Sequence, residues 1–160
     1  NDRREYDNRL AGGCLLEMGI YPIAIAQYFL GEEPENISVS SHLAPNGVED
    51  DVVILAEYSQ GAKATLATSF RCKLQNWAYI IGEDGYIAIP DFWRADHCSL
   101  YQLDECVESY SDDRKGLGFE FEISAVSADI LAGKVYSEVV SPEMSMAFQR
   151  VMRRVLESIK

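Results

Sequence analysis

An apolar segment over residues 11–30 is the first strong pattern along the chain. Its most regular face carries hydrophobic or small residues at intervals of three or four: Leu15, Gly19, Ile23, Ala26 and Leu30. The remaining faces are also largely apolar, and a helix without a polar face is typical of a buried element. Gly31 then favours the left-handed backbone at which helices end. The pattern predicts a buried helix.

Between residues 36 and 110 the hydrophobic period changes to two, which indicates β-strands. The predicted strands are Ile37–Leu43, Val52–Ser59, Ala62–Cys72, Trp77–Gly82, Tyr86–Pro90, Ser99–Leu103 and Cys106–Tyr110. The segments Gln60–Gly61 and Glu83–Gly85 supply turn residues that tolerate positive φ, so consecutive strands are expected to form antiparallel hairpins.

Two further helices are predicted after the strands. The first has apolar residues at helical spacing from Phe119 to Ile130 and ends near Gly133, and the second follows the start signal Ser141–Glu143 and reaches Ile159. The fold class is therefore α+β: a predominantly antiparallel open β-sheet, with helices expected on one face.

The predicted strands are apolar on both faces. Trp77, Tyr79 and Ile81 alternate with Ala78 and Ile80. A sheet with one solvated face should show a cleaner alternation. We expect the second face to meet a second copy or another domain, unless long loops cover it.

Composition limits the class of partner. The 160 residues are enough for one domain, and 14 basic against 26 acidic side chains give a formal charge of −12. Such a charge disfavours nucleic acid and anionic membranes as partners. The apolar run Ile20–Leu30 is shorter than a membrane span, and no signal peptide is recognised at Asn1, so a cytoplasmic location is expected.

The scattered cysteines and histidines form no zinc pattern, so neither a metal nor a disulfide is expected: Cys14, Cys72, Cys98, Cys106, His42 and His97. The pair Gly12–Gly13 precedes the first helix, as phosphate-binding turns do, but the chain has no complete glycine-rich fingerprint. No dinucleotide site of its own is expected.

Glu17 is the one fully charged residue between Leu10 and Gly31. A carboxylate in an apolar helix is costly unless it is paired or solvated. Tyr21 follows four positions later on the same helix face, and Pro22 predicts a kink or break over residues 19–22. The pair is either a proton-transfer site or a half-buried core tyrosine beside a carboxylate that caps a loop.

The segment Leu10–Pro22, with the sequence LAGGCLLEMGIYP, resembles the LAGGxLLDxGxY segment of the Gfo/Idh/MocA oxidoreductases. Further stretches resemble the carboxy-terminal domain of that family, in order along the chain: Ser59–Ala62, Ile80–Trp93, Gly118–Glu122 and Ser141–Ser145. The resemblance implies a fold like the carboxy-terminal domain of glyceraldehyde-3-phosphate dehydrogenase. Residues 1–160 would be a single substrate and dimerisation domain, with the amino-terminal Rossmann domain lying before a fragment boundary at Asn1.

By the same resemblance, Tyr21 matches the catalytic residue that exchanges a proton with the substrate. Glu17 stands where the family usually has a substrate-binding aspartate, and Trp93 lies in a segment that can border the substrate. NAD or NADP and the lysine that assists the reaction would be held by the missing domain. The resemblance thus implies hydride transfer to or from a sugar, polyol or similar secondary alcohol, with the fragment alone inactive.

An alternative belongs to a different class of function. In it the chain is a non-catalytic assembly module, a homo-oligomer formed through the sheet face, and Tyr21 has only a structural role.

Overall fold

The computed structural model describes residues 3–159, and the chain divides into two compact units that are described here one at a time. The first unit runs to Leu74 and includes the chain from Glu143 onward. The second comprises Gln75–Pro142. The expected boundary at Asn1 lies outside the described residues.

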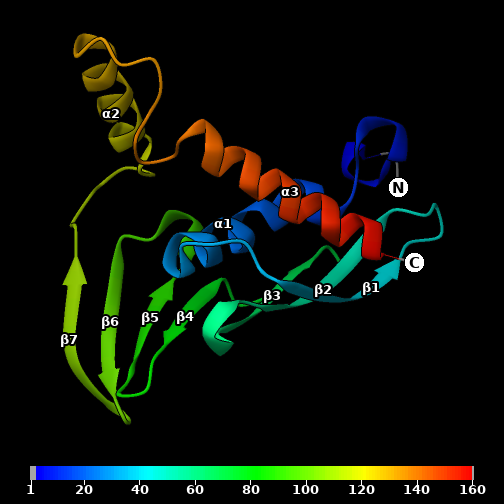
Figure 1. Cartoon of the computed structure of the whole chain (residues 1–160), viewed down its shortest axis with the longest axis horizontal. Coiled ribbons are helices and arrows are strands. Elements are labelled where there is room, and N and C mark those ends of the chain that lie inside the picture. Colours follow the sequence, from blue (N-terminus) through cyan, green and yellow to red (C-terminus); the bar gives the residue numbers. More distant parts are fainter. Residues whose placement is uncertain (1–2, 160) are drawn as a thin grey trace. The chain divides into compact units, whose positions relative to one another are not determined.

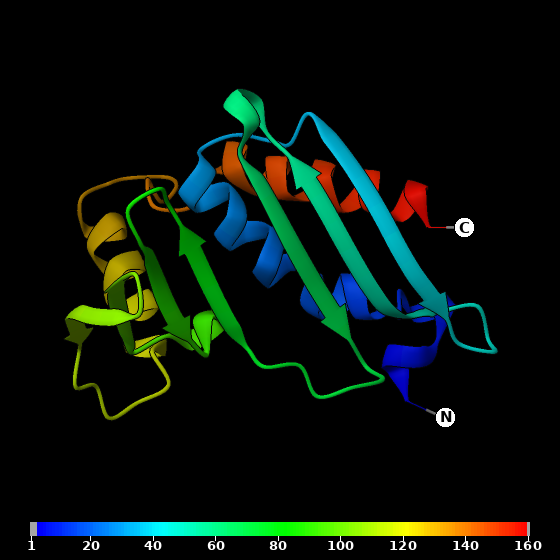
Figure 2. The same cartoon turned by 90° about the horizontal axis from the view of Figure 1, so that it is seen from below.

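The first unit is a three-stranded antiparallel sheet covered by helices on one face (Figures 1 and 2). Its strands, in the order β1-β2-β3, are β1 (Asn36–Leu43), β2 (Glu49–Glu57) and β3 (Lys63–Ser69). Its helical elements are two 3-10 turns, η1 (Arg4–Tyr6) and η2 (Asn8–Leu10), a π-helical turn η3 (Leu15–Gly19), α1 (Ile20–Leu30), the 3-10 turn η4 (Ser59–Gly61) and α3 (Pro142–Ser158).

The core of this unit lies between the sheet and the helices. Val52, Ile54 and Ala56 point from β2 into the core, whereas Val53 and Leu55 between them are exposed. The helices contribute buried residues at helical spacing: Leu15, Ile23, Ala26, Val151, Met152 and Val155. Burial of each large aliphatic side chain contributes about 1.5–3 kcal/mol, so this layer supplies most of the stability of the unit.

The second unit contains a four-stranded antiparallel sheet in the order β4-β5-β6-β7. Its elements are β4 (Trp77–Ile81), β5 (Tyr86–Pro90), the 3-10 turn η5 (Phe92–Arg94), β6 (His97–Gln102), β7 (Glu105–Ser111) and α2 (Phe119–Leu131). Four aromatic rings lie in a row across three strands, with centroids 5.8, 6.1 and 4.9 Å apart: Trp77, Tyr79, Tyr86 and Tyr101. We call these residues the aromatic row.

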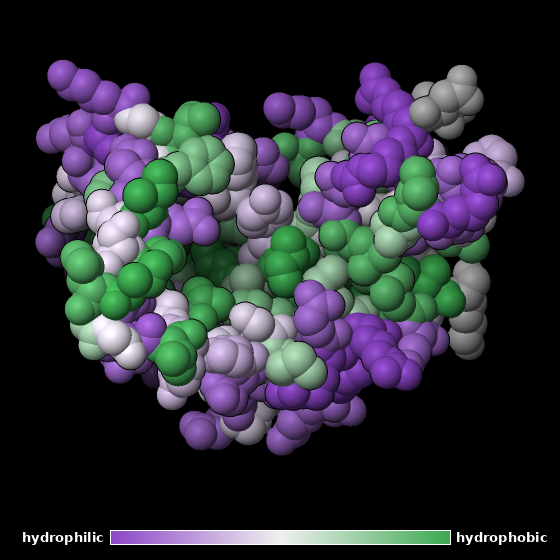
Figure 3. All heavy atoms as spheres, turned by 90° about the horizontal axis from the view of Figure 1, so that it is seen from above, coloured by the Kyte–Doolittle hydropathy of each residue, from purple (hydrophilic) through white to green (hydrophobic). Residues whose placement is uncertain are grey.

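Hydrophobic side chains reach the surface in both units, as the face seen in Figure 3 shows. In the second unit, α2 carries no buried residue, and its apolar stripe from Phe119 to Ile130 is exposed. Such extended apolar surface is typical of a region that contacts another chain or domain.

The α+β class and the order of elements predicted from the sequence are confirmed. The strands form two sheets rather than one meander, since β3 and β4 do not pair, and β3 ends at Ser69 rather than at Cys72. The Ser69 hydroxyl accepts from the backbone N–H groups of Arg71 and Cys72, at 3.1 and 3.3 Å. This local turn competes with the sheet ladder and ends the strand.

The two hairpin turns use glycine for different reasons. Gln60 and Gly61 adopt φ of 58° and 84°, as the sequence predicts. At the other turn Gly85 does not have positive φ; there, a Cβ would collide with the carbonyl oxygen of Tyr101. The glycine therefore permits a close approach between neighbouring strands.

The expectation that the first helix is buried on every side is wrong. Leu15, Ile23 and Ala26 are buried, but Tyr28 and Phe29 are exposed because only one face of α1 packs against the sheet. The segment Asn8–Leu30 is long and apolar enough to span a membrane by length and composition alone. Since its buried residues pack on β2 and β3, it is a core helix of this unit.

Candidate functional site

Glu17 and Tyr21 lie on either side of a change in helix geometry. Glu17 is in the π-helical turn η3, and Tyr21 is the second residue of α1. The predicted distortion is present, but it begins earlier, at Leu15, and ends at Gly19, and Tyr21 keeps helical geometry. Pro22 has no N–H to donate to the Met18 carbonyl, and a wider turn accommodates that loss. π-helical turns of this kind are frequent at functional sites.

Both predicted residues reach solvent. Tyr21 is 47% exposed, and the Glu17 side chain is 37% exposed. The phenol is therefore accessible, which a proton donor to an external substrate requires. An exposure of 47% fits the alternative of a half-buried tyrosine equally well, so the role of Tyr21 stays a prediction.

Glu17 is paired with Arg4, which the sequence pattern did not indicate. Arg4 Nη2 donates to Glu17 Oε1 at 2.8 Å and to Oε2 at 2.7 Å. The pairing explains how a carboxylate is accommodated in an apolar helical segment. It also replaces the suggestion that Glu17 caps a loop, because its partner is a side chain from η1.

A second carboxylate, Glu49, occupies the start of the same helical segment. Glu49 is 7% exposed, and a Cβ on Gly13 would collide with its carboxylate oxygens. Burial raises the pKa of the Glu49 carboxyl, an effect that its own backbone N–H and that of Leu15 partly offset by hydrogen bonding. Anions are favoured at helix N-termini, and here the protein supplies the anion itself.

Cys14 lies beside this carboxylate in the core. Its thiol donates to the Thr68 carbonyl at 3.5 Å, and the Thr68 hydroxyl donates to the Cys14 carbonyl at 3.1 Å. Burial, together with the negative charges of Glu49 and Asp51, raises the pKa of the Cys14 thiol to about 12. Cys14 is therefore a structural residue rather than a nucleophile.

Trp93 lies in η5 of the second unit, after Asp91, which adopts a left-handed backbone. Its ring is 47% exposed and is covered on one side by the Arg94 guanidinium, 4.8 Å from the ring centroid. The predicted contact of Trp93 with substrate stays a prediction.

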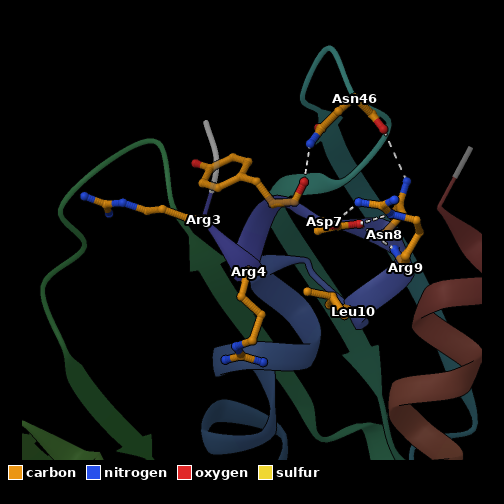
Figure 4. Close-up of a pocket in the computed structure, with 8 residues that line it drawn as sticks. Arg3, Arg4, Asp7, Asn8, Arg9, Leu10 and Asn46 are labelled. Atoms are coloured by element: carbon orange, nitrogen blue, oxygen red, sulfur yellow. Dashed lines mark hydrogen bonds and ion pairs between the residues drawn. The ribbon is translucent and has the colours of Figure 1, made fainter.

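An open pocket of about 700 Å³ lies at the amino-terminal segment (Figure 4). It is lined by Arg3, Arg4, Tyr6, Asp7, Asn8, Arg9, Leu10 and Asn46. Figure 4 shows that the Arg3, Arg4 and Arg9 side chains point in different directions. Arg9 is paired with Asp7 at 2.8 Å. Because these cations do not converge, the pocket is not a formed anion site.

The described residues do not fit a dinucleotide phosphate at the Gly12–Gly13 turn, since Glu49 already lies against its backbone. Within residues 3–159 no three histidine, cysteine or acidic side chains are grouped as metal ligands. Tyr21 and the Arg4–Glu17 pair offer groups that can exchange a proton and hydrogen-bond to hydroxyl groups.

The first unit of this α+β chain thus carries a phenol and a carboxylate four positions apart in one helical segment. A family model described as the GFO/IDH/MocA C-terminal domain matches residues 1–88. The chain belongs to this family, which confirms the resemblance seen in the sequence.

Curated relatives support the same class. The trans-1,2-dihydrobenzene-1,2-diol dehydrogenase of Xenopus laevis is 27% identical over 164 residues, which cover 98% of this chain and 49% of the relative. The mouse enzyme of the same name is 34% identical over 91 residues, covering 56% of this chain and 27% of the relative. The chain spans about half the length of the Xenopus laevis relative.

Solved structures show the same fold at low sequence identity. Aldose-aldose oxidoreductase from Caulobacter crescentus superposes with a TM-score of 0.83 at 19% identity, covering 98% of this chain and 48% of that one. KijD10, a 3-ketoreductase from Actinomadura kijaniata solved with NADP, gives 0.78 at 20% identity, covering 98% and 49%.

Proposed function

We propose that this chain is the substrate-binding and dimerisation half of an NAD(P)-dependent oxidoreductase, which acts on a secondary hydroxyl of a sugar, polyol or similar compound. The observation that carries the proposal is the exposed Tyr21 phenol one helical turn from Glu17, in a chain of this family. The nicotinamide cofactor and the assisting lysine would belong to an amino-terminal Rossmann domain. The described chain alone would then be inactive.

The relatives named above support this choice of substrate. Their names describe a dehydrogenase of a dihydrodiol, an oxidoreductase of aldoses and a ketoreductase. This chain aligns with about half the length of the Xenopus laevis relative and of both solved structures, as expected if it corresponds to one domain of a two-domain enzyme.

Tyr21 would handle the proton. A phenol hydrogen-bonded to a carbonyl oxygen can donate its proton when that oxygen becomes an alcohol, and it accepts the proton in the reverse reaction. Glu17 would accept a hydrogen bond from a neighbouring hydroxyl of the substrate and so orient it. The hydride is the part of the reaction that a nicotinamide cofactor supplies or accepts.

Dimerisation would use a sheet face. The aromatic row gives the second unit a partly exposed aromatic surface, and aromatic residues are enriched at protein interfaces. A second copy of the chain is the proposed partner.

The test replaces Tyr21 by phenylalanine in the full-length protein. Turnover of diol or sugar substrates should fall by about 10²-fold or more, since general acid–base catalysis contributes factors of that size. Cofactor affinity, measured by fluorescence titration, should stay unchanged. Tyr28→Phe, an exposed position on the same helix, is the matched control. Equal turnover in Tyr21→Phe would remove the proton-transfer role.

A further inference from the structure

The contact between Arg4 and Glu17 engages both oxygens of the Glu17 carboxylate. A single guanidinium nitrogen, Nη2, donates to both carboxylate oxygens, at 2.8 and 2.7 Å. The Arg4 side chain is 57% exposed and that of Glu17 is 37% exposed. Ion pairs exposed to this extent contribute little to the free energy of unfolding, because water screens them. What the contact does fix is the orientation of the carboxylate.

The backbone next to Arg4 is hydrogen-bonded to the Gly12–Gly13 turn, which precedes Glu17. The Gly13 N–H donates to the Glu5 carbonyl at 2.9 Å, and the Gly12 N–H donates to the Asp7 carbonyl at 3.0 Å. A Cβ on Gly12 would lie 2.7 Å from the Glu5 oxygen, so glycine is needed for this approach. Arg4 therefore contacts Glu17 from a segment whose backbone is fixed by hydrogen bonds to the turn at residues 12–13.

The direction of the Arg4 side chain agrees with this arrangement. In Figure 4 it extends toward the helical segment, away from the Arg3 and Arg9 side chains. Arg9 lies in the same segment but pairs with Asp7 instead. Arg9 can therefore serve as a control for Arg4, since it is a nearby arginine that does not contact Glu17.

We propose that Arg4 is a positioning residue, which holds the Glu17 carboxylate in the direction needed to accept a hydrogen bond from a substrate hydroxyl beside Tyr21. This inference rests on the proposed function. Each oxygen engaged by Arg4 keeps a second lone pair for that hydroxyl. Since the charges of Arg4 and Glu17 cancel, the site suits neutral polyhydroxy compounds better than carboxylated or phosphorylated ones.

The experiment is a double-mutant cycle in the full-length protein with a neutral diol or aldose. Arg4→Met should raise KM by about tenfold and change kcat by less than about threefold, because loss of orientation weakens binding more than proton transfer. In a Glu17→Gln background, Arg4→Met should change kcat/KM by less than about twofold. Arg4→Lys should recover most of the lost kcat/KM, and Arg9→Met should behave as the unmutated protein.

The outcomes separate this inference from the proposed function. Equal losses from Arg4→Met in both backgrounds would overturn the inference, since Arg4 would then act without Glu17. Unchanged kinetics in Arg4→Met would do the same while leaving the proposed function intact. If the unmutated full-length protein turned over none of these substrates, the proposed function would fail and the inference with it. Should Arg4→Met not fold, a cycle with Arg4→Gln, which also removes the charge, supplies the same comparison.

Discussion

The carboxylate of Glu49 lies in the space that a side chain on residue 13 would need. Gly13 has φ of 130°, and a Cβ built there would overlap the Glu49 carboxylate oxygens. The requirement for glycine at this position therefore comes from a buried acid of β2, which the sequence around residue 13 does not reveal.

Replacing Gly13 by alanine should strongly destabilise the first unit. The added methyl must displace a buried carboxylate and adopt an unfavourable backbone, so we expect a loss of about 2–4 kcal/mol in the free energy of unfolding. Urea denaturation measures this loss. Gly31→Ala is the control, because Gly31 also has positive φ but has open space around it, and should cost only about 1 kcal/mol. Equal costs at the two positions would contradict the collision.

Glu49 should make stability depend on pH. Its pKa is raised in the folded state, so the folded protein binds the proton more tightly than the unfolded chain does. The resulting stabilisation is complete below the unfolded pKa, for which the ordinary value is 4.5, and is lost as pH rises through the folded pKa. Glu49→Gln should therefore gain stability relative to the unmutated protein as pH increases from 4 to 7. A difference that is constant over this range would refute the prediction.

The four cysteines should differ in reactivity. Cys14 is buried, with its pKa raised to about 12, whereas Cys72 and Cys106 are exposed. A thiol reagent at pH 8 should label the two exposed residues quickly and should reach Cys14 only in denaturant, since thiolate and access are both required. Mass spectrometry of the labelled peptides provides the measurement. Rapid labelling of Cys14 in the native protein would show that its surroundings open readily.

A charge within the aromatic row should disrupt the proposed dimer. Tyr79→Glu places a carboxylate among the rings, so light scattering should report the mass of one chain where the unmutated protein gives that of two. Leu103→Glu is the control, because Leu103 is an exposed apolar residue in the turn between β6 and β7. If both variants remain dimeric, the dimer uses another surface.

The elements could be predicted because their signals are local. The apolar repeat of α1 and α3 and the alternation in β1 to β7 each depend on residues that are only a few positions apart in the sequence. Tyr21 and Glu17 were also found locally, as polar residues in an apolar segment. The first turn of that segment was less predictable, since the wider turn that accommodates Pro22 begins at Leu15, before the range of the expected kink.

The surroundings of the site depend on long-range contacts, which a local pattern cannot report. Glu49 begins an acidic run, Glu49–Asp51, that reads as a solvated surface, yet Glu49 is buried against Gly13. Arg4 lies 13 positions before Glu17, with no periodic relationship to it. In both cases the partner is selected by how distant segments pack.

The turn at Gly12–Gly13 is already filled by the Glu49 carboxylate, and this limits what else it can bind. A helix that already satisfies its positive end with an internal acid has no vacancy there for a diphosphate group. If the protein is the proposed oxidoreductase, the phosphates of its coenzyme would have to be bound by a different turn, outside the first unit.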